Sequence, residues 1–362
     1  MNLYVHVPFC ASKCRYCAFR SEPAPPPEAV RDYLRLLPRE LGLRGLSGAR
    51  PGTVYVGGGT PSLLGPDGVE ALFAALPRPA PGAEVTVECN PGDVTPELAA
   101  ALADAGATRV SLGVQSFSDR ALRWLGRRHD AARARAAFDT VREAGFRNVS
   151  IDLIAALPDE PEGEFAETLR EAAALGPDHA SVYVLSVEPG TPLARAGVRP
   201  APDGVALAAV AAAAAALGAA GLARYEISNY ARPGFECRHN LAVWRGEDYA
   251  GVGPAAWSRE GLVRRGNGGG FAAWRDALEA GRLPPAETVA VSPADDEAER
   301  FATRVRLARF DGPDPATEAG RRRLETLRRF AAAGAVRETG GGRWALEERG
   351  FEISDALMAD LV

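Results

Sequence analysis

The chain has 362 residues, of which 46% are hydrophobic and 25% are charged, and its formal net charge at pH 7 is −5. This composition is typical of a folded globular protein of two or three domains and excludes a disordered or fibrous chain. The acidic balance predicts no general surface for binding nucleic acid.

Short β-type segments alternate with helical patterns through roughly the first half of the chain. The predicted strands are Leu3–Val7, Thr53–Val56, Glu84–Glu88, Arg109–Val114, Asn148–Ile154 and Ala180–Leu185. Amphipathic segments rich in alanine and leucine separate them, and parallel strands need such helical crossovers. The pattern therefore predicts an α/β fold with a parallel sheet, such as an incomplete α/β barrel.

Chemically useful residues lie at or just after the carboxyl ends of these strands. They are Cys10, Gly57 to Pro61, Glu88, Gln115, Asp152 and Ser186. In α/β barrels the loops at the carboxyl ends of the strands build the active site. We therefore expect these residues to gather around one mouth.

The later part of the chain follows a different pattern. Residues 204–223 are rich in alanine and glycine, which contribute little transfer energy, so a helix packed on the sheet is predicted rather than a membrane span. Residues 232–253 look irregular. Helices are predicted at Glu297–Arg309 and Glu318–Ala333, with a hairpin at Val336–Leu346. The predicted division is a barrel over 1–232, a connecting segment over 233–290 and a small α+β, winged-helix-like module over 291–362.

Three of the five cysteines, Cys10, Cys14 and Cys17, have C-x3-C-x2-C spacing directly after the first predicted strand. Three thiolates on one loop suit three irons of a [4Fe-4S] cluster. The fourth iron would stay open to the amino and carboxylate groups of S-adenosylmethionine (SAM), whose sulfonium an electron can split to a 5′-deoxyadenosyl radical. A zinc site with His6 as fourth ligand is the alternative. Disulfides are not expected, because the number of cysteines is odd and no signal peptide precedes them.

Several motifs together resemble the HemN/HemW branch of the radical SAM proteins. Besides the cysteine triplet they are Tyr4 to Cys10, Gly57 to Ser62, Glu88 to Pro91, Gly113 to Phe117, Leu125 to His129, Ile151 to Ile154, Tyr225 to Ala231 and Cys237 to Asn240. The resemblance covers nearly the whole chain. It implies a partial (β/α)6 radical SAM barrel with a C-terminal helical module.

The resemblance also implies roles for individual residues. It places Tyr4, Gly58 and Glu88 around a SAM bound to the cluster. It places Tyr16, Gly59, Thr60, Gln115, Arg127, Asp152 and Ser186 where HemN contacts a second SAM. Asp152 and Gln115 suit ribose hydroxyls, and Arg127 suits a carboxylate. The alternative for Glu88 and Asp152 is a structural carboxylate that is capped or salt-bridged.

The two members of the branch differ near the cluster. HemN, the oxygen-independent coproporphyrinogen III oxidase, continues with C-x-C and has an additional N-terminal segment. This chain has Cys17-Ala18-Phe19, the form found in HemW, and only nine residues before Cys10. These two features favour HemW, which is regarded as a haem chaperone.

The haem motif of HemW, H-N-x-x-Y-W, is present in part. His239, Asn240 and Trp244 match, but Val243 replaces the tyrosine, and Trp257 stands where histidine is usual. His239 is a candidate axial haem ligand because imidazole is a standard ligand for haem iron, and Cys237 is a second candidate. The alternative for His239 is a hydrogen-bonded loop residue.

We therefore expect a haem chaperone that binds the cluster, SAM and haem and delivers haem to an acceptor protein. An electron donor such as flavodoxin or ferredoxin is the other expected partner. The second hypothesis is a radical SAM enzyme of tetrapyrrole metabolism or a related methyltransferase, so enzymatic activity stays open. Neither nucleic acid nor a membrane span is expected, and the location expected is the cytoplasm.

Overall fold

The computed structural model describes residues 1–361. In this part of the chain the main sheet has twelve strands, in the order β14-β13-β12-β11-β1-β4-β5-β6-β7-β8-β10-β9. Its central parallel strands are β1 (Asn2–Val7), β4 (Thr53–Gly58), β5 (Glu84–Cys89), β6 (Arg109–Gln115), β7 (Val149–Ala155) and β8 (His179–Val184). They are the predicted strands and they stand side by side in chain order, which confirms the predicted parallel α/β sheet. On its outer side β1 pairs with β11 and β8 pairs with β10.

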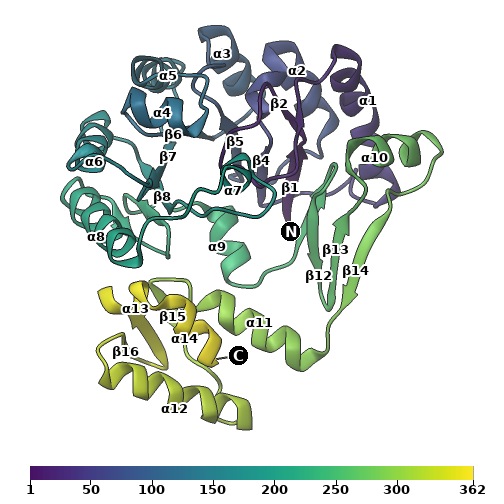
Figure 1. Ribbon diagram of the computed structural model, residues 1–362. Coiled ribbons are helices and arrows are strands. Elements are labelled where there is room, and N and C mark those ends of the chain that lie inside the picture. Colours follow the sequence, from purple (N-terminus) through teal and green to yellow (C-terminus); the bar gives the residue numbers. More distant parts are fainter. Residues whose placement is uncertain (362) are drawn as a thin grey trace.

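Helices cover one face of this sheet (Figure 1). They are α1 (Pro27–Leu43), α2 (Gly65–Ala75), α3 (Pro96–Asp104), α4 (Asp119–Leu125), α5 (Ala131–Glu143), α6 (Glu164–Leu175) and α8 (Asp203–Ala219), with the short η1 (Pro61–Leu64). The short α7 (Pro192–Arg195) lies apart from them, and the N–H of Leu193 donates to the carbonyl of Arg15 at 3.0 Å. The segment 204–223 thus forms the predicted helix, which contacts α6 and β8. Among residues 1–361 no helix combines the length and apolarity that crossing a membrane requires.

The central strands alternate apolar and polar residues, and this alternation determines where the core lies. In β1 the apolar residues Leu3, Val5 and Val7 are fully buried in the main core. Successive side chains of a strand point to opposite faces, so Tyr4 and His6 face the other side of the sheet. The same alternation in β4 to β8 makes the helix-covered face apolar and the inner face polar. A polar inner face is available for binding charged or polar molecules.

Residues 232–253 were expected to be irregular, and this expectation is wrong. β9 (Ala223–Arg224) and β10 (Asn229–Ala231) precede α9 (Arg238–Trp244) and β11 (Tyr249–Val252), and β11 joins the main sheet parallel to β1. A Cβ on Gly251 would lie 2.0 Å from the carbonyl oxygen of Trp257, so this glycine permits close contact with β12 and does not mark a loop.

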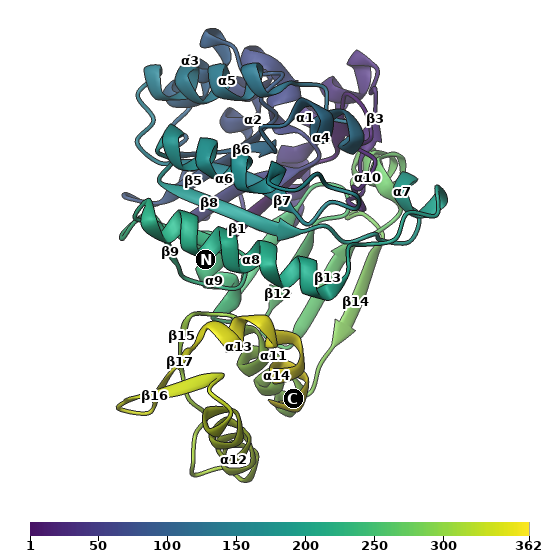
Figure 2. The same cartoon turned by 60° about the vertical axis from the view of Figure 1, so that its left-hand side comes forward.

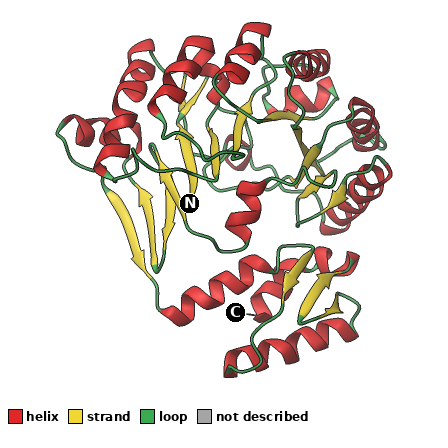
Figure 3. Ribbon diagram, turned by 180° about the vertical axis from the view of Figure 1, so that it is seen from behind, coloured by secondary structure: helices red, strands yellow, loops and turns green. Residues whose placement is uncertain are grey.

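Residues 254–290 extend the sheet further. β12 (Trp257–Glu260), β13 (Val263–Asn267) and β14 (Ala286–Ala290) add antiparallel strands beyond β11, and they project along one side of the molecule (Figure 3). α10 (Gly270–Glu279) lies between β13 and β14 in the chain and packs against α1. The segment expected to connect the barrel to the tail therefore contributes four strands to the main sheet.

Residues 293–361 form a module with its own core, visible below the sheet in Figure 2. Its elements are α11 (Pro293–Arg304), β15 (Arg309–Asp311), α12 (Glu318–Ala332), β16 (Val336–Gly340), β17 (Arg343–Leu346), α13 (Glu348–Glu352) and α14 (Ser354–Leu361). Phe301, Leu327, Trp344 and Leu357 are buried at its centre. The two predicted helices and the predicted hairpin are confirmed.

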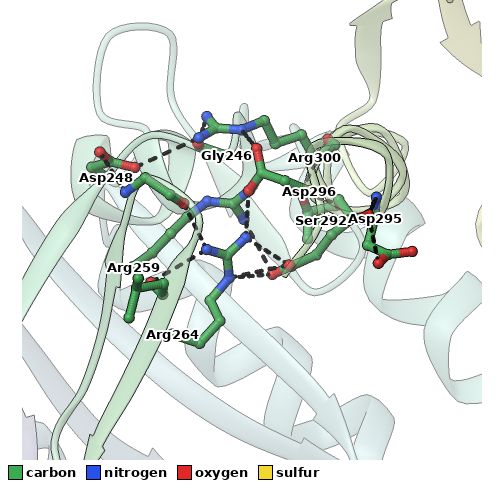
Figure 4. A network of polar contacts seen from close by, with 12 residues as sticks. Gly246, Asp248, Arg259, Arg264, Ser292, Asp295, Asp296 and Arg300 are labelled. Atoms are coloured by element: carbon green, nitrogen blue, oxygen red, sulfur yellow. Dashed lines mark hydrogen bonds and ion pairs between the residues drawn. The ribbon is translucent and has the colours of Figure 1, made fainter. Parts of the chain in front are cut away.

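A network of ion pairs joins this module to the added strands of the sheet (Figure 4). Asp296 of α11 accepts from Arg259 Nη2 of β12 at 2.6 Å, from Arg264 Nη2 of β13 at 2.5 Å and from Arg300 Nε at 2.7 Å. Burial raises the pKa of Asp296, but the hydrogen bonds from Arg300 and Arg264 outweigh it and the pKa falls to about 2. The carboxylate therefore stays ionised at all but strongly acidic pH.

Replacing Asp296 by asparagine is expected to lower the free energy of unfolding by about 2 kcal/mol, because charge-assisted hydrogen bonds to three guanidinium groups are weakened. Since the pKa of Asp296 is lowered in the folded protein, its stabilisation is complete above its ordinary pKa of 3.8 and is lost as pH falls towards 2. Urea denaturation at pH 7 and pH 3 measures both effects. Asp295→Asn, at an exposed neighbour bonded to Ser292, is the control. An equal loss in the two variants would contradict the role of the network.

Candidate functional site

The predicted cluster cysteines lie on a loop whose ends are tied together. β2 (Phe9–Cys10) pairs in parallel with β3 (Glu22–Pro23), and the N–H of Ala24 donates to the carbonyl of Cys10 at 2.8 Å. Within the loop, the N–H of Arg15 donates to the carbonyl of Leu125 at 3.0 Å, which fixes the loop against the end of α4. The side chains of Cys10, Cys14 and Cys17 are free thiols of intermediate exposure. The loop thus presents three thiols without a disulfide among them.

A pocket of about 520 Å³ opens beside this loop at the carboxyl ends of the central strands. It is lined by most of the candidate residues, namely Cys10, Cys14, Cys17, Tyr16, Gly58, Gly59, Thr60, Glu88, Gln115, Arg127, Asp152 and Ser186. These residues come from separate segments between residues 10 and 186. The structure therefore brings the expected strand ends together around one mouth.

Glu88, at the end of β5, is held by two hydrogen bonds on the inner face of the sheet. Tyr55 Oη donates to Oε1 at 2.7 Å, and the N–H of Gly58 donates to Oε2 at 3.2 Å. Burial raises the pKa of Glu88 and nearby Asp152 adds to the rise, while both hydrogen bonds oppose it, and the net result is a pKa of about 7. Glu88 therefore changes charge close to neutral pH.

Two further polar residues reach the pocket from β6 and β7. Asp152 accepts from Ser111 Oγ, which lies 3.3 Å from each carboxylate oxygen, and burial raises the pKa of Asp152. Gln115 ends β6 after an irregularity in the pairing of β6 with β7, and its φ is +68°. A positive φ is unfavourable for a residue with a side chain and is found preferentially at functional sites.

Arg127 lies between the pocket and the cysteine loop. Its Nη2 donates to the carbonyl of Gly113 at 2.7 Å, while Nη1 lies 3.4 Å from both Cys14 Sγ and Tyr16 Oη. Its Nε is buried and has no hydrogen-bond partner. On the other side of the loop, Thr60 Oγ1 donates to Cys10 Sγ at 3.5 Å. Two of the three cysteines therefore have a side-chain donor directed at sulfur.

The glycines at the end of β4 have a packing role that the sequence did not reveal. A Cβ on Gly58 would lie 2.4 Å from His6 Nδ1, and the φ of Gly58 is +103°. A Cβ on Gly59 would lie 2.5 Å from the carbonyl oxygen of Phe9. The close approach that requires glycine is thus to neighbouring protein atoms, although both glycines also line the pocket.

Tyr4, His239 and the fully buried Cys237 are candidates that do not line this pocket. Tyr4 Oη lies 3.0 Å from His6 Nδ1, and its ring stacks on Tyr55 with centroids 6.3 Å apart. His239 belongs to α9, which lies between the sheet and the C-terminal module (Figure 1). Its Nδ1 lies 2.8 Å from Oγ1 of Thr53, the first residue of β4, whereas the pocket is at the other end of that strand. The structure therefore separates His239 from the cysteines.

The hydrogen bonds of His239 define its tautomer. Thr53 Oγ1 donates to Asn2 Oδ1 at 2.9 Å, so it accepts from His239 Nδ1–H and leaves Nε2 with a free lone pair. Burial lowers the pKa of His239 to about 4, so the ring is neutral at pH 7. The side chains of His6, His129 and His179 have partners at both ring nitrogens. Within residues 1–361, only His239 has a ring nitrogen without a hydrogen-bond partner.

Some pocket residues were not among the candidates. Ser111 and Tyr183 line it, as do Lys13, Phe19 and Glu188. The first two lie on strands at two-residue spacing from other lining residues, so the alternation rule would have found them. Phe19 is 69% exposed beside the cysteine loop, and no pattern in the sequence indicates this.

The donor chemistry of the site distinguishes between the two metal hypotheses. Among the described residues 1–361, no three His, Cys, Asp or Glu side chains are grouped closely enough to hold a single metal ion. A zinc ion binds its ligands at about 2.0–2.3 Å, and the proposed fourth ligand His6 has both ring nitrogens engaged. A four-iron cubane spreads its thiolate ligands over separate irons. Three free thiols around one pocket fit the cluster.

Comparisons with known proteins find relatives along the whole chain. Residues 4–172 match the Radical SAM superfamily model. The chain is 38% identical to the haem chaperone HemW of Mycobacterium tuberculosis (strain ATCC 25618 / H37Rv), covering 100% of this chain and 94% of that protein. It is 39% identical to the haem chaperone HemW of Escherichia coli (strain K12), covering 71% of this chain and 69% of that protein.

Among solved structures, the chain is similar to coproporphyrinogen III oxidase (HemN) from Escherichia coli. The TM-score is 0.84, the sequence identity is 23%, and the match covers 99% of this chain and 89% of that chain. At this identity the likeness establishes the fold only. The predicted radical SAM fold, with its added C-terminal module, is confirmed.

Proposed function

The chain belongs to the HemW family of radical SAM proteins, and from this membership we propose that it is a haem chaperone that keeps a cluster and SAM site. The observation that carries the proposal is the pocket where Cys10, Cys14 and Cys17 meet the polar ends of the central strands. A purely structural sheet would have little use for so many converging polar groups.

The residues of this pocket divide by chemistry. Cys10, Cys14 and Cys17 would hold a [4Fe-4S] cluster. The carboxylates of Glu88 and Asp152 would accept hydrogen bonds from the amino group or ribose hydroxyls of SAM. When bound, the cluster supplies electrons one at a time, which it would receive from a small electron-transfer protein such as flavodoxin or ferredoxin.

We assign haem ligation to His239. The relatives that cover this chain are named haem chaperones, and His239 is a neutral histidine whose Nε2 lone pair is free. A metal-bound histidine usually has its other nitrogen fixed by a hydrogen bond. In this protein Thr53 Oγ1 accepts such a bond from His239 Nδ1. His239 is only 5% exposed, so α9 must move to admit a planar macrocycle. Delivery would then pass haem from this position to an acceptor protein.

A titration with haemin tests the chaperone proposal. Anaerobically purified, cluster-loaded protein is expected to develop a saturable Soret band with one haem per chain. It is then expected to lose that band when an apo-haem protein is added as acceptor. No saturable Soret band would reject the proposal.

A radical SAM enzyme is the second candidate, and the pocket itself favours it. Arg127, Asp152 and Ser186 line space beyond the cysteine loop, in a pocket of about 520 Å³. Incubation with SAM and dithionite measures 5′-deoxyadenosine, and coproporphyrinogen III tests whether a porphyrinogen accelerates its release. If coproporphyrinogen III speeds the release of 5′-deoxyadenosine and is itself converted, the enzyme is favoured. If haemin binds stably and does not change the rate of 5′-deoxyadenosine release, the chaperone is favoured.

SAM binding is expected to weaken as the pH falls through about 7. Protonation removes acceptor capacity from Glu88, whose pKa is raised to about 7, so affinity should drop about tenfold between pH 8 and pH 6. Calorimetric titration of the cluster-loaded protein with SAM measures this dependence. Glu88→Gln should bind SAM more weakly and with a flat profile. Glu160→Gln, which removes a carboxyl of similarly raised pKa outside the pocket, should keep the slope. A wild-type profile without this slope would refute the role of Glu88.

A further inference from the structure

We propose that Arg127 is a redox-tuning positioning residue, whose guanidinium donates to the Cys14 thiolate and makes the cluster easier to reduce. This inference rests on the proposal that the three cysteines hold a cluster. It concerns a different property, which is the reduction potential of that cluster.

Each of the three cysteine sulfurs has its own protein donor. Thr60 Oγ1 donates to Cys10 Sγ at 3.5 Å, and Arg127 Nη1 donates to Cys14 Sγ at 3.4 Å. The thiol of Cys17 is approached by the backbone N–H of Phe19. A hydroxyl and an amide are neutral donors, whereas guanidinium carries a full positive charge. Cys14 is therefore the cysteine whose sulfur has a charged hydrogen-bond donor, whereas the charge of Lys13 acts on Cys17 without a hydrogen bond.

The guanidinium of Arg127 is fixed in this position. Nη2 donates to the carbonyl of Gly113 at 2.7 Å, and Tyr16 Oη accepts from Nη1 at 3.4 Å. A Cβ on Gly113 would lie only 3.3 Å from Nη2, so glycine at this position leaves room for the guanidinium. A donor held in this way needs little reorganisation when the charge on sulfur changes.

No carboxylate in residues 1–361 makes a direct ion pair with Arg127. The adjacent Arg128 pairs with Asp93 at 3.3 Å, whereas Arg127 forms no such ion pair within residues 1–361 and bonds Tyr16 and Cys14. The Asp152 carboxylate acts on Arg127 through its charge without a hydrogen bond between the two side chains. A buried cation without a counterion is costly. A thiolate-ligated cluster beside Nη1 would supply negative charge in direct contact with the guanidinium.

The direction of the effect follows from the charge. Reduction adds an electron to a cluster already ligated by thiolates, and hydrogen bonds to sulfur and local net charge set the potential of such clusters. A cationic donor stabilises the more negative, reduced state more than the oxidised state. Removing Arg127 should therefore make the potential more negative.

Redox titrations monitored by electron paramagnetic resonance measure the reduction potential of the cluster. They are made without SAM, because Arg127 could otherwise also contact the SAM carboxylate. At the wild-type midpoint potential, Arg127→Gln should lower the ratio of reduced to oxidised cluster at least tenfold, a shift of about 59 mV for a one-electron couple. Arg127→Lys, which keeps the charge without the fork, should shift less. Thr60→Val should shift in the same direction by a smaller amount.

Arg128→Gln is the matched control, because Arg128 lines the same pocket but its guanidinium is paired with Asp93. Its potential should equal that of the wild type. An unchanged potential in Arg127→Gln, or an equal shift in Arg128→Gln, would overturn the inference. If Arg127→Gln fails to hold iron, an unchanged potential in both Arg127→Lys and Thr60→Val would overturn it. A wild-type protein that holds no cluster would instead reject the proposed function.

Discussion

Replacing Cys14 by alanine is expected to abolish the cluster, with iron and acid-labile sulfide falling to background. Only two loop thiolates would remain, because His6 has both ring nitrogens engaged and Cys89, although it borders the pocket, is packed into the main core. Cys14 is partly exposed on a loop, so the free energy of unfolding should change by less than about 1 kcal/mol. The loss would therefore be specific to the cluster.

Anaerobic reconstitution of Cys14→Ala, followed by iron and sulfide analysis, measures this effect. Cys89→Ala is the matched control, since it removes a cysteine from the core and leaves the loop intact. That variant should keep its iron although it loses some stability through the cavity it creates. Full iron retention in Cys14→Ala would show that Cys14 is not a ligand.

Replacing His239 by alanine is expected to abolish the saturable Soret band. His239 Nε2 is the histidine nitrogen left without a partner in residues 1–361, and its ring is neutral at pH 7 because burial lowers its pKa. Thr53→Val should keep haem binding but weaken it about tenfold, the scale seen when a group that orients a metal ligand is removed. Absorbance titration with haemin measures both affinities.

The control for His239→Ala must also remove a buried histidine. His179→Ala serves this purpose, because His179 is as buried as His239 but bonds Ser150 and Tyr225 through its two ring nitrogens. Both variants should lose stability, so haem is compared per mole of folded protein. A Soret band that survives in His239→Ala and disappears in His179→Ala would contradict the assignment.

The central sheet could be predicted from sequence because its strands alternate apolar and polar residues and helices separate them. Leu3, Val5 and Val7 show this pattern clearly. β11 was missed because it is short and because Gly251, which allows close packing on Trp257, looks like a loop residue. Local patterns do not distinguish a glycine required by a neighbouring strand from one in a turn.

The residues of the pocket could be proposed from motifs, but their contacts could not. Arg127 and Cys14 are more than one hundred residues apart, and their contact depends on how the cysteine loop packs against the end of α4. For His239 the motif predicted the residue but not where it lies in the fold. Its distance from the cysteines follows from pairing with Thr53 at the amino end of β4.

The most direct measurement is the metal and sulfide content of wild-type protein purified without oxygen. If Cys10, Cys14 and Cys17 ligate a [4Fe-4S] cluster, the protein will contain roughly four irons and four acid-labile sulfides per chain. It will contain no stoichiometric zinc. One zinc per chain without sulfide, with the same three thiols protected from alkylation, would contradict the account.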